Sequence, residues 1–139
     1  MLEISSASLS AAGLWTALNL GLMMLLGFNA SRVRVRERVV VGTGQNQVLE
    51  RAVRAHGNNT EWVPGLIICL LVAALLGETE TMIHLFGVSL LLARICHAHG
   101  MHVLDKPVPP TRLIGNVLSW VIFIAVVLRL LYLSLQYYL

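Results

Sequence analysis

Residues 4–31 read ISSASLSAAGLWTALNLGLMMLLGFNAS and contain no charged side chain. A helix rises about 1.5 Å per residue, so a helix of this length is longer than the roughly 30 Å hydrocarbon layer of a bilayer. The run therefore predicts a transmembrane helix. The acidic Glu3 stands before it, where a signal peptide would carry basic residues, so we expect this first span to be retained.

Three further apolar segments follow, each interrupted by charge. The expected spans are residues 7–31, 47–77, 81–104 and 111–136. The sequence DKPVPP at residues 105–110 is too rich in proline to continue a helix, and GETE at residues 77–80 predicts a tight turn. The chain is therefore predicted to be an all-α membrane protein, a single four-transmembrane-helix bundle over residues 1–139.

Composition supports this fold class. The 139 residues are 57% hydrophobic and only 12% charged, whereas a soluble domain carries about 25% charged residues. So little charge cannot cover a water-facing surface, which excludes a soluble globular domain, a disordered chain and a nucleic-acid-binding module. Four spans would use most of the chain and leave no room for a second, soluble domain.

The charges of the connections predict the topology. The basic ones are Arg32, Arg34, Arg36 and Arg38 in the first connection and Lys106 and Arg112 in the third; the acidic ones on the other side are Glu3, Glu78 and Glu80. By the positive-inside rule, the Arg-rich connection is cytoplasmic and both termini are outside. The Arg-rich run can serve topology alone, or it can also attract an anionic ligand or lipid headgroups.

The second span begins with the polar sequence ERAVRAHGNNTEWVP at residues 50–64. At about 100° per residue, one helix face collects Glu50, Arg51, Arg54, Gly57, Asn58 and Glu61. This stripe has two interpretations. It is a salt-bridged helix end in the headgroup layer, or it faces a polar cavity in which Arg54 and Asn58 hold an anionic ligand and Glu61 holds its amine or a neighbouring arginine.

The third span places Arg94 and His97 on one face, three residues apart. Charge at membrane depth is costly and is usually paired. Arg94 therefore either pairs with a carboxylate, for which Glu61 is the natural candidate, or snorkels to the cytoplasmic side. Cys96, His97, His99 and His102 are dense enough to raise metal binding. His97 and His99 point roughly 160° apart on a helix, so we expect no metal site.

A family resemblance rests on these same residues. The motif is Glu50-Arg51-x-x-Arg54-Ala55-His56-x-Asn58-x-x-Glu61-x-x-Pro64, followed by Arg94-x-x-His97. It resembles the MAPEG superfamily, the membrane-associated proteins in eicosanoid and glutathione metabolism, which includes the microsomal glutathione transferases. The likeness covers nearly the whole chain, and its short connections are most similar to the bacterial inner-membrane branch.

The resemblance implies a homotrimer in the inner membrane that binds glutathione between subunits near the cytoplasmic side. It implies glutathione contacts for Arg34, Glu50, Arg51, Arg54, Asn58, Glu61, Arg94 and His97. It also implies that Arg112 stabilises the glutathione thiolate, because a guanidinium beside a thiol favours its charged form. The expected activity is that of a glutathione-dependent transferase or peroxidase acting on hydrophobic small molecules dissolved in membrane lipids.

Three positions depart from the family pattern. Gly57 stands where eicosanoid-type members carry another arginine, Met101 where several carry a tyrosine, and Leu113 where some carry a serine. These differences remove two hydroxyl groups and one cation. They favour the alternative that the chain is a non-catalytic trimeric membrane protein, or a lipid- or thiol-binding module of the same fold.

Overall fold

The computed structural model describes residues 5–105, 108–136 and 138–139. Of the residues used above, Glu3, Lys106 and Pro107 lie outside this part of the chain. Four helices are described: α1 (Ser6–Arg36), α2 (Gln47–Leu75), α3 (Glu80–His102) and α4 (Pro110–Leu135). Each is long and apolar enough to cross a membrane. The predicted four-helix membrane fold is confirmed.

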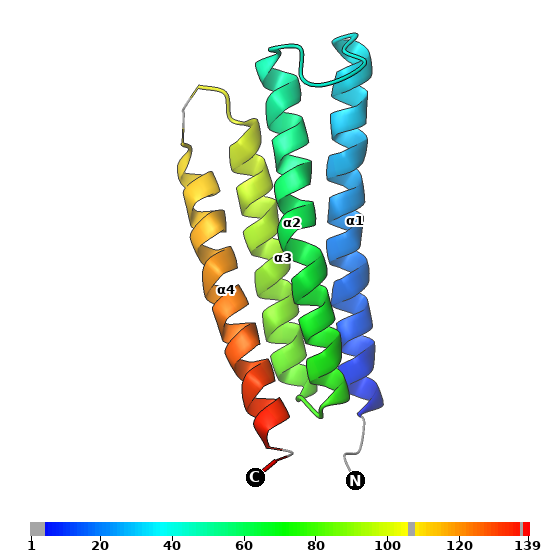
Figure 1. Cartoon of the computed structure of the whole chain (residues 1–139), viewed down its shortest axis with the longest axis vertical. Coiled ribbons are helices and arrows are strands. Elements are labelled where there is room, and N and C mark those ends of the chain that lie inside the picture. The colour runs from blue at the N-terminus through cyan, green and yellow to red at the C-terminus, as the bar shows by residue number, and fades with distance from the viewer. Residues whose placement is uncertain (1–4, 106–107, 137) are drawn as a thin grey trace.

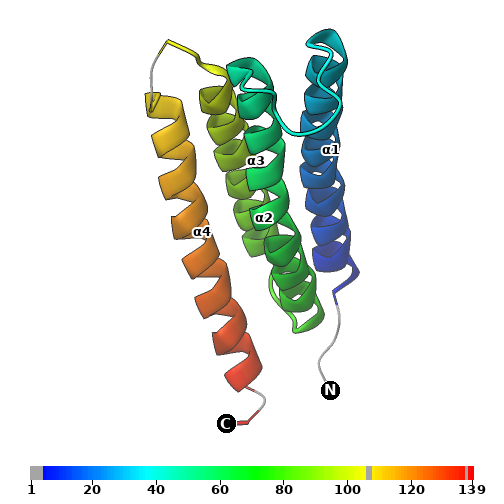
Figure 2. The same cartoon turned by 45° about the horizontal axis from the view of Figure 1, so that its top comes forward.

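The helices lie side by side and alternate in direction (Figures 1 and 2). The α1–α2 and α3–α4 connections lie together at one end, the top of Figure 1, and the α2–α3 turn lies at the other end. The most extensive contacts are those of α3 with α4 and of α1 with α2. Within the described residues α1 and α4 have no close backbone contact, so α4 forms one edge of the bundle.

Side-chain caps fix where three of the helices begin. Ser5, Asn46 and Thr79 each accept a hydrogen bond from a backbone N–H of the following turn, at 3.4, 2.9 and 3.3 Å. Such caps satisfy donors that the helix itself cannot pair. Helix α4 instead begins with Pro110, whose missing N–H is not needed in the first turn.

Helix α1 continues past the end of the uncharged run. The uncharged sequence predicts a span to residue 31, whereas the helix ends at Arg36, where the Glu37 N–H donates to the Val33 carbonyl at 2.9 Å. Charge marks where a helix leaves the apolar layer and not where its backbone hydrogen bonds stop. Part of the Arg-rich run therefore forms the last turn of α1.

The main apolar core lies in the half of the bundle nearest the α2–α3 turn. It contains Ala11 and Ala12 of α1, Leu66, Leu70, Ala73 and Ala74 of α2, Ile83, Leu90 and Ala93 of α3, and Ile122, Val126 and Leu133 of α4. The polar residues of the predicted site come from the other half, near the α1–α2 and α3–α4 connections. The fold thus separates a packed apolar half from a half that contains the polar groups.

The α2–α3 turn is fastened to α4 by an ion pair. Glu78 is only 1% exposed and accepts two hydrogen bonds from the Arg129 guanidinium, from Nε and, at 3.1 Å, from Nη2. Burial alone would raise the pKa of the Glu78 carboxyl, but the bonds from Arg129 and Thr79 outweigh it and lower that pKa below its ordinary value. The pair holds the end of α4 against the turn.

Candidate functional site

Arg94 is the centre of the polar half. Its side chain is fully buried, and its guanidinium donates to three neutral oxygens: Nε to Asn59 Oδ1 at 3.0 Å, Nη1 to Ser119 Oγ at 3.2 Å and Nη2 to Asn58 Oδ1 at 2.7 Å. A guanidinium can only donate. The bonds therefore orient both amides with their oxygens toward Arg94 and link α2, α3 and α4.

The expected direct ion pair between Arg94 and Glu61 is wrong, although the Glu61 carboxylate is close enough to act on Arg94 electrostatically. Glu61 Oε1 lies 3.8 Å from Arg54 Nη1, and both of those side chains are more than half exposed. No described carboxylate forms an ion pair with Arg94. Glu61 lies on the open face of α2, whereas the buried Asn59 projects toward α3. Snorkelling is excluded as well, because Arg94 is 0% exposed.

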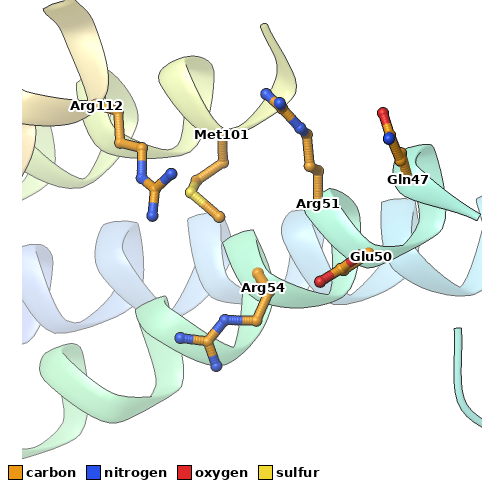
Figure 3. Close-up of a pocket in the computed structure, with 6 residues that line it drawn as sticks. All are labelled: Gln47, Glu50, Arg51, Arg54, Met101 and Arg112. Carbon is orange, nitrogen blue, oxygen red and sulfur yellow. The ribbon is translucent and has the colours of Figure 1, made fainter. Parts of the chain in front are cut away.

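Beside this network lies a cavity of about 380 Å³, the arginine cavity (Figure 3). It is lined by Gln47, Glu50, Arg51, Arg54, Met101 and Arg112. Met101 of α3 and Arg112 of α4 lie across from the α2 side chains. Arg51 donates to the Val103 carbonyl just past the end of α3. The cavity combines one carboxylate with three guanidinium groups, which suits a ligand with several carboxylates and one ammonium.

A second cavity of about 240 Å³, the amide cavity, is lined by Asn58, His97, Val108, Arg112, Leu113 and Asn116. Arg112 lines both cavities. His97 is 4% exposed, and its Nδ1 has no hydrogen-bond partner among the described residues. A buried polar atom without a partner costs free energy. A polar ligand bound in this cavity could form the hydrogen bond that His97 Nδ1 lacks.

Two glycines bring α3 and α4 together at these cavities. A Cβ atom at Gly100 would lie 2.3 Å from the Arg112 backbone nitrogen, and one at Gly115 would lie 2.4 Å from the His97 nitrogen. Both distances are too short for any side chain. This close approach puts the first turn of α4, with Arg112, directly beside the last turns of α3.

The structure brings together most of the predicted site residues. Glu50, Arg51, Arg54 and Arg112 line the arginine cavity, Asn58 and His97 line the amide cavity, and Arg94 binds Asn58. Two predicted residues lie apart. Glu61 lines neither cavity, and Arg34, in the last turn of α1, donates to the Val39 and Gly42 carbonyls of the α1–α2 connection, at 3.3 and 2.7 Å.

Four polar residues of the site were missed by the sequence reading: Gln47, Asn59, Ser119 and Asn116. Neutral side chains carry no charge signal. Ser119 and Asn116 are nevertheless polar interruptions of an apolar span, three residues apart and so on one helix face, which is a usable signal. Among the described residues, no cluster of three or more His, Cys, Asp or Glu could hold a metal ion.

Comparison with known proteins gives two matches. The sequence model of the MAPEG family matches residues 12–132. The inner membrane protein YecN of Escherichia coli, from two strains, is 34% identical over 91 residues, which cover 66% of this chain and 70% of that protein.

Proposed function

The chain belongs to the MAPEG family, and from this premise we propose that it is a glutathione-dependent membrane transferase or peroxidase. In this proposal the glutathione sulfur forms a bond to hydrophobic electrophiles, or two glutathione thiols reduce hydrophobic peroxides and become a disulfide. The reaction takes place in the inner membrane, the location printed in the name of the E. coli relative. Four membrane-spanning helices and two polar cavities at one end of the bundle support a site that a water-soluble thiol and a lipid-soluble substrate can both reach.

The observation that carries the proposal is the environment of Arg94. A fully buried cation held only by neutral oxygens has no compensating charge among its direct partners. Burying an ion costs several kcal/mol unless it is paired. Glu61 acts on Arg94 only through space, so an anionic ligand in the neighbouring cavities would add negative charge closer to it, and Arg112 lines both cavities.

Glutathione has the complementary chemistry. It carries two carboxylates, one ammonium and a thiol, and the arginine cavity offers Arg51 and Arg54 to the carboxylates and Glu50 to the ammonium. The thiol then lies near Arg112, between the two cavities. There the guanidinium favours the thiolate, which is the nucleophilic form.

The proposed assembly is a homotrimer with the site at a subunit interface. Arg54 and Glu61 are more than half exposed in the isolated chain although they belong to a membrane-spanning helix. Charged groups in such helices normally face protein or water. A neighbouring subunit that covers this face of α2 would complete the site. Arg34 would then approach the ligand of the next subunit, with the Arg-rich connection cytoplasmic and both termini outside.

The test uses the purified full-length protein in detergent. Glutathione should bind and produce thiolate absorbance in the ultraviolet, and an aryl halide should be conjugated. Arg112→Ala should keep glutathione binding and lose the thiolate absorbance. The matched control, Arg32→Ala, removes an exposed arginine that lines neither cavity and should behave as wild type.

A second candidate function is ligand binding without catalysis. Met101 puts a thioether, which cannot donate a hydrogen bond, into the wall of the arginine cavity. Binding of glutathione with neither thiolate absorbance nor turnover would favour this candidate. Absence of any glutathione binding would overturn the proposed function.

A further inference from the structure

Asn116 is the polar side chain of the amide cavity that neither the Arg94 network nor the glutathione contacts explain. It lies on α4 four residues after Arg112, one helical turn away. Its amide forms no hydrogen bond among the described residues, and its neighbours Leu113, Ile114, Val117 and Leu118 are apolar and exposed. An amide without a hydrogen-bond partner on an otherwise apolar helix face is costly, so the Asn116 amide is available to a ligand in the amide cavity.

The amide cavity is rich in hydrogen-bond donors. Asn58 Oδ1 accepts a hydrogen bond from Arg94, so the Nδ2 group of Asn58 is what remains for a ligand. Arg112 can only donate, and Asn116 contributes a second amide N–H group. No carboxylate lines this cavity among the described residues. Donors that line one cavity can stabilise negative charge that develops on an oxygen during a reaction.

The walls of the same cavity indicate where its substrate comes from. Val108, just before α4, is 59% exposed, and Leu113, in the first turn of α4, is 56% exposed. An apolar tail can therefore lie along the outside of α4 while a polar head enters the cavity. A cavity of about 240 Å³ suits a small head group rather than a whole lipid.

We propose that Asn116 binds the carbonyl oxygen of lipid-derived conjugated enals and enones and makes them the preferred electrophiles. This rests on the proposed function. The glutathione thiolate forms a C–S bond to the β-carbon, and the C=C electron pair moves so that the carbonyl oxygen becomes an enolate oxygen. Asn116 Nδ2 donates to that oxygen. A proton equivalent to the one lost by the thiol then adds to the α-carbon, so nothing is oxidised or reduced.

The experiment compares two electrophiles in the full-length protein. One is trans-2-nonenal, which has an apolar tail and a conjugated carbonyl; the other is a tert-butyl-substituted benzyl bromide, which has no oxygen to accept a hydrogen bond. Asn116→Ala should lower kcat/KM for nonenal by about 100-fold, the effect of losing one oxyanion donor. The value for the benzyl halide should change less than threefold. Glutathione affinity and thiolate absorbance should stay at wild-type levels.

Asn116→Ser is the matched variant, since it is as small as alanine and differs from it by one hydroxyl donor. Its kcat/KM for nonenal should be at least tenfold higher than that of Asn116→Ala. Equal loss on both electrophiles, or no difference between the alanine and serine variants, would overturn the role of Asn116. These outcomes differ from failure of the proposed function, in which the wild-type protein binds no glutathione at all.

Discussion

Gly100 of α3 lies so close to α4 that a Cβ atom added to it would fall 2.3 Å from the backbone nitrogen of Arg112. The position of Arg112 therefore depends on the absence of a side chain on the neighbouring helix. Because Arg112 lines both cavities, a change in helix spacing is also a change in the site.

We expect Gly100→Ala to move the first turn of α4 away from α3. Overpacking of this kind typically costs about 1–3 kcal/mol, so the thermal unfolding midpoint in detergent should fall. The thiolate absorbance of bound glutathione should fall with it, because Arg112 moves. The control is Gly21→Ala, where an added Cβ meets nothing within 4 Å. A variant that keeps wild-type absorbance would show that Arg112 does not need this contact.

The Arg94 network gives a second prediction. Asn59→Ala removes the oxygen that accepts a hydrogen bond from Arg94 Nε, and both side chains are buried. An unsatisfied donor on a buried cation costs about 2–4 kcal/mol, and the unfolding midpoint should drop accordingly. Asn29→Ala, which removes only an exposed hydrogen bond to His102 at 3.0 Å, should cost under about 1 kcal/mol. Similar losses in the two variants would contradict the central role of Arg94.

The sequence predicts the four helices well because long uncharged runs and proline-rich or acidic turns are strong local signals. It also predicts the polar stripe of α2, since helical periodicity alone places Glu50, Arg54 and Asn58 on one face. It fails for the partners of Arg94. Charge alone points to Glu61, whereas the register of α2 against α3 decides that the neutral Asn59 projects inward. That register depends on packing between helices, which spacing along one helix does not specify.

The Glu78–Arg129 pair predicts a pH dependence of stability. The pKa of Glu78 is lowered in the folded protein, so the ionised carboxylate contributes stability that is present above the unfolded pKa. That contribution is lost as the pH falls through the folded pKa. Wild-type protein should therefore lose thermal stability in the acid range, below the ordinary carboxyl pKa.

Glu78→Gln should be less stable than wild type at neutral pH and should have a flatter acid profile. The control is Glu80→Gln, whose side chain is 56% exposed and lies 3.6 Å from His84; it should keep the wild-type profile. Both are followed by thermal unfolding across the acid range. A Glu78→Gln profile as steep as that of wild type would assign the pH dependence to other groups.

Arg54 offers the clearest test of ligand binding by the α2 stripe. Its guanidinium lines the arginine cavity, and its pairing with Glu61 at 3.8 Å is exposed and so contributes little to stability. Arg54→Ala should therefore leave the free energy of unfolding within about 1 kcal/mol of wild type. It should weaken glutathione binding at least tenfold, because a charge-assisted hydrogen bond contributes about 1.5–3 kcal/mol. Arg54→Lys keeps the charge but loses the planar guanidinium. Its affinity for glutathione should lie between those of wild type and Arg54→Ala. Calorimetric titration with glutathione measures all three proteins, and equal affinities would remove Arg54 from the site.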